Sequence, residues 1–239
     1  VTGEFSGNDL KGICYEQLID WVRPEEGAFR VLTGDFVTTE DGTGIVHIAP
    51  TFGADDYRVA RENGVPPLIM KRKDGSMGPM GDKRGFMVPI EDLDETFVKN
   101  SVNIKTYSEY AAKPVKNEYD PSRAEDAETL DVEIAVMLKQ QGKAFRIEKH
   151  VHSYPHCWRT DKPVLYYPLD AWFIRTTAFQ DRLIELNNTI NWKPASTGSG
   201  RFGKWLENLV DWNLSRSRYW GTPLPIWITE DHSEEKFIG

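Results

Sequence analysis

The runs of apolar residues in this chain are short. One of the longest, at residues 65–70, has six residues and contains two prolines. Because a helix that spans a membrane needs about 18 or more consecutive apolar residues, we expect no membrane-spanning helix. Short apolar segments separated by turns predict a chain that folds from short strands and helices around a core.

Length, charge and cysteine content narrow the class of protein further. The 239 residues suffice for one large or two modest domains. The formal net charge of -8 argues against a protein that binds nucleic acid by bulk basic charge, and we expect no DNA partner. Cys14 and Cys157 are the only cysteines, which favours a reducing, cytoplasmic setting. The chain begins at Val1 with no targeting segment, so we expect a piece of a longer protein.

The first part of the chain reads as short strands followed by a helix. Helical composition runs over residues 54–63, with two acidic residues in the first turn and Gly64 at the end. Residues 71–85 are rich in Gly, Lys and Asp, which predicts a hairpin or surface loop with little core. The strand-forming segments are residues 29–32, 36–39 and 44–49.

The composition changes towards the C-terminal part of the chain. Most of the eight tryptophans lie after position 157, and no internal repeat is visible. We therefore expect a domain boundary between about residues 145 and 162, and divide the chain into 1–150 and 151–239. The further predicted elements are helices at 91–99, 125–141, 176–187 and 201–211 and strands at 144–147 and 164–167.

A candidate ligand site lies between the strand at 44–49 and the helix that follows it. Glycines flank Thr43, His47 lies in the strand, and Asp55 and Asp56 open the helix. A carboxylate there can hold a substrate ammonium, and a nearby histidine can orient a hydroxyl or a water. The alternative is that both carboxylates only stabilise the helix N-terminus and that His47 is a core residue.

Two other groups of residues carry weaker signals. Residues 150–157 include His150, His152, His156 and Cys157, side chains of the types that bind zinc. The spacing lacks a paired Cys-x2-Cys, and Tyr154-Pro155 redirects the chain, so we expect no metal site. The basic runs at 71–73 and 83–84 suit either a phosphate backbone or a solvated loop.

Aromatic residues near the end of the chain indicate either an apolar pocket or core packing. Trp172-Phe173-Ile174 and residues 218–225 place large aromatics beside turn-forming Gly and Pro. The pattern alone leaves both interpretations open.

Three stretches resemble the isoleucyl-tRNA synthetase family of class I synthetases. They are residues 42–50 with Asp55-Asp56-Tyr57, residues 152–159 (HSYPHCWR) and residues 215–223 (SRSRYWGTP). Their order and spacing resemble the family over nearly the whole chain, and the third stretch separates it from the valyl and leucyl enzymes.

The resemblance implies an α/β fold with two incomplete domains. Residues 1–150 would form the later part of a β-barrel-like editing domain with surrounding helices. Residues 151–239 would form the returning, partial segment of the Rossmann-type catalytic domain. The HIGH and KMSKS signatures that flank the ATP site are absent. We therefore expect no cofactor in this chain, with ATP and magnesium bound elsewhere in the parent enzyme, and no aminoacylation by the chain alone.

The implied activity is ligation of isoleucine to tRNA(Ile) with ATP, accompanied by hydrolysis of mischarged valyl-tRNA. A pocket that accepts isoleucine cannot exclude valine by steric clash. The missing methylene is worth only about 1–3 kcal/mol, a magnitude for which this very family is the standard example. A second, smaller pocket then separates the two amino acids by exclusion.

The resemblance also implies roles for individual residues of the editing pocket. Asp56 corresponds to the aspartate that binds the α-ammonium of the mischarged amino acid. His47 corresponds to the histidine that shapes the pocket or positions water for attack on the ester. Thr43, Gly44 and Phe52 line the same pocket.

In the second region, Trp172 and Trp220 correspond to walls of the isoleucine pocket. Ser217 departs from the family, which more often has a longer amide side chain there. A competing hypothesis is a non-catalytic tRNA-binding or interaction module in which His47 and Asp56 are structural. A zinc hydrolase that uses residues 150–157 ranks last.

Overall fold

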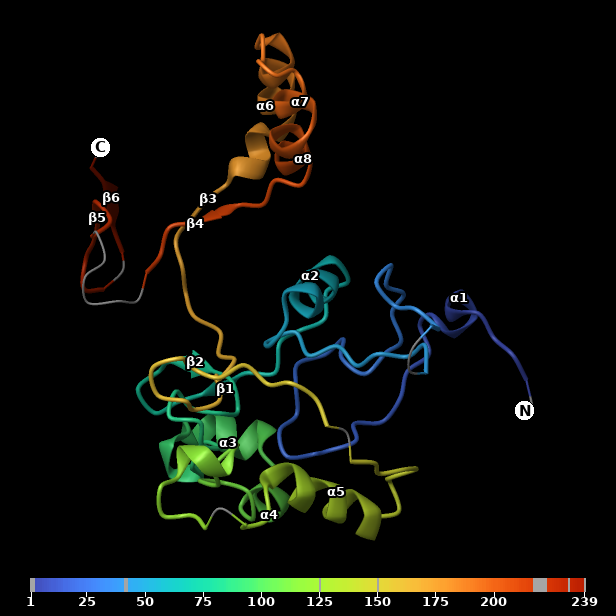
Figure 1. Cartoon of the computed structure of the whole chain (residues 1–239). Helices are drawn as coiled ribbons and strands as arrows, with labels where there is room; N and C mark the ends of the chain where they lie inside the picture. The colour runs from blue at the N-terminus through green and yellow to red at the C-terminus, as the bar shows by residue number, and fades with distance from the viewer. Residues whose placement is uncertain are drawn as a thin grey trace. The chain divides into compact units, whose positions relative to one another are not determined.

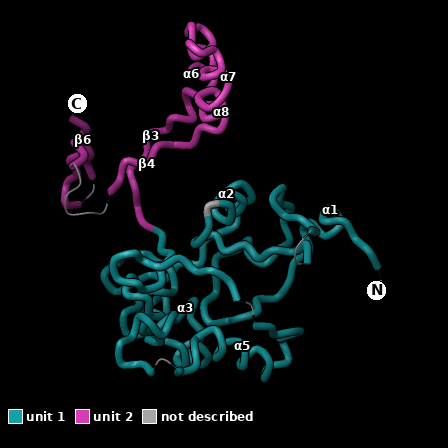
Figure 2. The backbone as a smooth tube through the Cα atoms, viewed as in Figure 1, with its two compact units in different colours: residues 1–168 teal, residues 169–239 magenta. Residues whose placement is uncertain are grey.

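The computed structural model describes residues 3–40, 43–124, 126–149, 151–216, 223–231 and 233–238. The chain divides into two compact units, unit 1 (Val1–Pro168) and unit 2 (Leu169–Gly239), shown in Figure 2. Residues 151–168 thus belong structurally to unit 1. The division of function at residue 150 stays a prediction.

Unit 1 confirms the helices expected near residues 54–63 and 125–141. The first helix begins after Gly53 and ends before Gly64, whose φ of 64° suits glycine. The second begins at Leu130, and Gly142 (φ 68°) follows its end. The helical elements, labelled in part in Figure 1, are α1 (Gly7–Leu10), α2 (Ala54–Glu62), a 3-10 turn (Ile90–Asp92), α3 (Glu95–Ser101), α4 (Ile104–Tyr107), a second 3-10 turn (Asn117–Tyr119) and α5 (Leu130–Gln140).

A short hairpin and the central core lie in the same part of unit 1. Strands β1 (Met70–Lys71) and β2 (Met77–Gly78) pair antiparallel, which confirms the hairpin expected within residues 71–85. The expectation of little core there is wrong at Pro79, because the chain folds back after β2 and buries this residue completely. We define the central core by its buried members: Trp21, Val22, Met70, Met87, Val88, Leu93, Tyr107, Tyr110 and Leu130.

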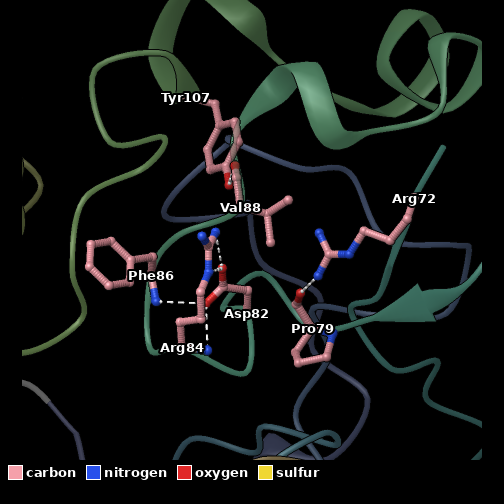
Figure 3. A network of polar contacts seen from close by, with 7 residues as sticks. All are labelled: Arg72, Pro79, Asp82, Arg84, Phe86, Val88 and Tyr107. Atoms are coloured by element: carbon pink, nitrogen blue, oxygen red, sulfur yellow. Dashed lines mark hydrogen bonds and ion pairs between the residues drawn. The ribbon is translucent and has the colours of Figure 1, made fainter. Parts of the chain in front are cut away.

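Polar contacts lie within the central core and within the segment that follows β1, as Figure 3 shows. The Tyr107 hydroxyl, fully buried, donates to the carbonyl of Val88 at 2.7 Å. The Arg72 guanidinium donates to the carbonyl of Pro79 at 2.6 Å. Asp82 accepts the backbone N–H groups of Arg84 (2.8 Å) and Phe86 (3.0 Å) and closes the next turn. The bond from Tyr107 satisfies a hydroxyl that burial would otherwise leave unpaired.

Unit 2 confirms helices near the predicted ranges 176–187 and 201–211. Asn187 is buried between them, donates to the carbonyl of Gly198 at 3.0 Å and accepts from the Trp192 indole at 2.9 Å. Its elements are β3 (Phe173–Ile174), a 3-10 turn (Thr176–Phe179), α6 (Gln180–Thr189), α7 (Ser196–Ser199), α8 (Arg201–Glu207), β4 (Trp212–Asn213), β5 (Ile226–Ile228) and β6 (Glu235–Phe237).

The described strands form three two-stranded antiparallel sheets, β1-β2, β3-β4 and β5-β6. Neither the β-barrel-like core nor a Rossmann-type parallel sheet forms within the described residues. The reason is that strand propensity needs a partner ladder to become a sheet. Cys14 and Arg30, for example, make one isolated bridge. The segments predicted as strands that are not strands are residues 29–32, 36–39, 44–49, 144–147 and 164–167.

The helices also agree with the short apolar runs of the sequence. None of the helices in the described part of the chain has both the length and the apolar character that crossing a bilayer requires.

Candidate functional site

Asp56 closes the loop at residues 43–56 onto helix α2. Its Oδ1 accepts the backbone N–H of Ala49 at 2.8 Å, which ties the first turn of α2 back to the loop. The preceding Gly53 is the N-cap residue and supplies no side-chain cap. A Cβ at this position would lie 2.0 Å from Oδ2 of Asp56. Glycine at position 53 therefore permits the carboxylate to face the loop.

The neighbouring Asp55 has a different environment. Its carboxylate is exposed and lies 3.5 Å from the Arg58 guanidinium, which also contacts Asp35 at 3.4 Å. The hydrogen bond with Asp35 raises the pKa of Arg58. Since Asp56 is only partly exposed, the structure separates the roles of the two adjacent carboxylates: Asp55 forms a surface ion pair and Asp56 holds the loop.

The remaining predicted residues of this site lie on the same loop. His47 is exposed, so the alternative that it is a core histidine is wrong. Thr43 accepts the backbone N–H of Ile45 at 3.3 Å through its hydroxyl, and Gly44 between them has a φ of 72°. Phe52 is exposed, and its backbone N–H donates to the carbonyl of Ala49 at 3.0 Å. Ala49 thus accepts a bond from Phe52 at its carbonyl and donates its N–H to Asp56.

Exposed apolar side chains accompany the polar groups of the loop. Ile45, Val46, Phe52 and Tyr57 all have large exposed fractions. Apolar surface beside a carboxylate suits a ligand that combines an aliphatic group with a cation.

In unit 2, Trp172 is positioned by the segment that leads into the third motif. Its backbone N–H donates to Ser215 Oγ at 2.7 Å, and its carbonyl accepts the N–H of Leu214 at 2.9 Å. Its ring meets Phe237 edge to face at 5.7 Å between centroids. Ser215 was not predicted as a site residue, and its place in the SRSR stretch was the available signal. Trp220 lies outside the described residues, as does Ser217.

The described members of the histidine and cysteine cluster are His152, His156 and Cys157. His156 and Cys157 belong to a hairpin at residues 155–164, and His150 lies outside the described residues. Within the described ranges, no group of three or more His, Cys, Asp or Glu side chains is placed to hold a metal ion. The Thr160 hydroxyl, hydrogen-bonded to the thiol, lowers the pKa of Cys157 to about 7.

Comparison with known proteins identifies the family to which this chain belongs. The family model for class I tRNA synthetases (I, L, M and V) matches residues 15–239. The chain therefore belongs to the class I tRNA synthetase family.

The individual relatives compared next are isoleucine–tRNA ligases. The chain is 66% identical to the isoleucine–tRNA ligase of Bacteroides fragilis over 238 residues, which covers all of this chain and 21% of the relative. The isoleucine–tRNA ligase of Porphyromonas gingivalis is also 66% identical, over 239 residues, with the same coverage of both chains. That of Clostridium tetani is 42% identical over 230 residues, 96% of this chain and 18% of the relative. The chain spans about a fifth of the length of the curated relatives it matches.

Proposed function

We propose that this chain is part of a cytoplasmic enzyme that ligates isoleucine to tRNA(Ile). We further propose that the loop at residues 43–56 belongs to the site where that enzyme hydrolyses tRNA mischarged with valine. The family match and the identity to isoleucine–tRNA ligases support the first part. The observation that carries the second is the Asp56 carboxylate, held against the loop by the N–H of Ala49.

The role proposed for Asp56 is to bind the α-ammonium of the misattached valine. An ionised carboxylate offers about four lone-pair sites, and the bond from Ala49 uses one of them. The remaining sites can accept N–H groups of the ammonium in charge-assisted hydrogen bonds. Asp55 is a poorer candidate because its exposed carboxylate pairs with Arg58 and, within the described residues, makes no bond to the loop.

The chemical step is the attack of water on the ester that joins valine to the terminal ribose. The new bond forms between the water oxygen and the carbonyl carbon, and the bond to the ribose oxygen breaks. The water proton moves to the departing ribose oxygen, which becomes a hydroxyl, so the products are valine and free tRNA. His47, exposed on the same loop, positions the water in this proposal. Thr43, Gly44 and Phe52 border the amino-acid side chain.

ATP and magnesium belong to the synthetic reaction of the whole enzyme. The HIGH and KMSKS signatures are absent from this sequence, so we assign them to parts of the enzyme beyond the residues described. Trp172 and Trp220 contribute to the isoleucine pocket in this proposal. The chain alone would not aminoacylate tRNA.

Deacylation of valyl-tRNA by the synthetase polypeptide that contains this chain tests the proposal. Asp56→Ala should lose hydrolysis while isoleucine charging is preserved, and the matched variant Asp55→Ala should keep both activities. If Asp56→Ala hydrolyses valyl-tRNA at the wild-type rate, the loop is a structural element of a tRNA-binding module and the editing assignment fails.

A further inference from the structure

The hairpin at residues 155–164 is held in one conformation by its backbone and its base. The N–H of Cys157 donates to the carbonyl of Lys162 at 2.8 Å, and the carbonyl of Cys157 accepts the N–H of Asp161 at 2.7 Å. Val164 donates to Pro155 at 2.9 Å on the next rung. These backbone bonds therefore fix how the tip is presented.

Aromatic residues anchor the base of this hairpin to the rest of unit 1. The Tyr119 hydroxyl donates to the carbonyl of Pro163 at 3.1 Å. The Tyr154 hydroxyl donates to the carbonyl of Val164 at 2.9 Å. Lys116 lies over the Tyr154 ring, 4.2 Å from its centroid. These contacts hold the base of the hairpin, and with it the tip, in place.

The tip presents a large exposed aromatic ring with a cation on it. Trp158 is 80% exposed, although tryptophan is a residue type that is usually well covered. The Arg159 guanidinium carbon lies 4.1 Å from the centroid of the Trp158 ring, a cation–π geometry. With one face against the guanidinium, the large exposed fraction leaves the opposite face open to a ligand.

The charges around the ring favour an anionic ligand. Residues 155–164 contain two basic residues, Arg159 and Lys162, and one acidic residue, Asp161. The chain as a whole, in contrast, has a net charge of -8. A flat apolar face beside local positive charge matches an unpaired nucleotide, whose base stacks and whose phosphate is anionic.

We infer that Trp158 and Arg159 form a stacking site for an unpaired nucleotide of the bound tRNA. Trp158 stacks on the base, and Arg159 supports the ring and contacts the adjacent phosphate. This inference rests on the proposed function, since it takes tRNA as the ligand. It assigns the HCWR stretch, which the editing site does not use, to RNA recognition.

Binding of tRNA(Ile) to the synthetase polypeptide that contains this chain tests the inference. Trp158→Ala should raise the Kd about 5- to 150-fold, the range expected for removal of one aromatic–base stack. Trp158→Phe should retain most of the affinity. Arg159→Ala should lower the slope of log Kd against log salt concentration by about one. Trp227→Ala, at an indole that is 68% exposed in unit 2, is the matched control and should bind normally.

Ultraviolet cross-linking of the wild-type complex, mapped by mass spectrometry, provides a readout that does not depend on a folded variant. We expect a nucleotide attached to the peptide that contains Trp158. Unchanged affinity in Trp158→Ala would overturn the inference, and so would a cross-link from Trp158 only to another protein segment. If these results come with hydrolysis that still depends on Asp56, the stacking site fails and the proposed function stands.

Discussion

In unit 1, Met70, Leu93 and Tyr107 are buried completely or almost so, whereas in unit 2 Val210 and Trp212 remain more than half exposed. Both units contain helices with apolar side chains, but among the described residues the buried apolar cluster forms in unit 1. Leu206 and Leu209 are the buried aliphatic side chains of unit 2 among the described residues. Because apolar burial supplies most of the stability of a fold, the two units should respond very differently to the same substitution.

Truncation of a fully buried leucine gives the largest expected difference. Leu93→Ala should lower the free energy of unfolding by about 2–5 kcal/mol, because it removes apolar contacts and leaves a cavity in the central core. Leu186→Ala, at a partly exposed position of α6, should cost less than about 1 kcal/mol. Urea denaturation measures both, and equal losses would contradict the contrast between the units.

The same valine-to-threonine change in each unit sharpens the comparison. Val88→Thr places a hydroxyl in the central core and should cost about 1–3 kcal/mol. Val210→Thr, at an exposed position, should change stability by less than about 0.5 kcal/mol. Thermal or urea unfolding of the pair tests this, and a neutral Val88→Thr would mean that the core is hydrated.

An ion-pair cluster beside the central core predicts a pH dependence. Burial raises the pKa of Glu133, but hydrogen bonds from Lys113 and Arg123 outweigh this effect and leave the pKa below its ordinary value. The contribution to stability is therefore present above the unfolded pKa of about 4.3 and is lost as the pH falls through the lower folded value.

Glu133→Gln should remove that contribution at neutral pH. The expected loss is about 1–2 kcal/mol, reduced from a fully buried pair because the side chains are partly exposed. The variant should also lose less stability than the wild type on acidification. Exposed Glu109→Gln serves as the control. If the stability of wild type and of Glu133→Gln falls equally on acidification, the ion pairs of Glu133 do not cause the pH dependence.

Replacement of Tyr107 should have the smallest effect on stability. Its pH dependence should appear at alkaline pH, whereas that of Glu133 appears at acidic pH. Burial raises its pKa to about 12, so its contribution is present below the unfolded pKa of about 10 and is lost as the pH rises towards the folded value. Tyr107→Phe removes the hydroxyl that donates to Val88 and should cost about 1 kcal/mol at neutral pH. Urea denaturation between about pH 9 and 11 should show a shallower decline for the variant. A decline as steep as that of the wild type would contradict the assignment.

Helices were more predictable from the sequence than strands. The start of α2 is marked by two acids and its end by Gly64, signals that are local in the chain. Residues 44–49, predicted as a strand, pair with no other strand among the described residues, because a strand depends on a second segment that local pattern does not specify. For the same reason, the buried Tyr107 could not be recognised from its neighbours in sequence.

The start of helix α2 was predictable in position, but the contacts of its two acidic residues were not. The sequence placed two carboxylates at the start of a helix, and only the structure distinguishes Asp56, which faces Ala49, from Asp55, which faces Arg58. Trp158 was visible as part of an unusual stretch, but its exposure and the placement of Arg159 depend on the hairpin bonds. Such orientation follows from tertiary contacts and not from spacing.

The central claim is that Asp56 binds the α-ammonium of the misattached amino acid. The direct measurement compares two substrates of the synthetase polypeptide: valyl-tRNA and tRNA esterified with the α-hydroxy analogue of valine, which lacks the ammonium. The account predicts that the wild type prefers valyl-tRNA and that Asp56→Ala loses this preference, because the mutation slows only the substrate with an ammonium. Equal slowing of both substrates by Asp56→Ala would contradict it.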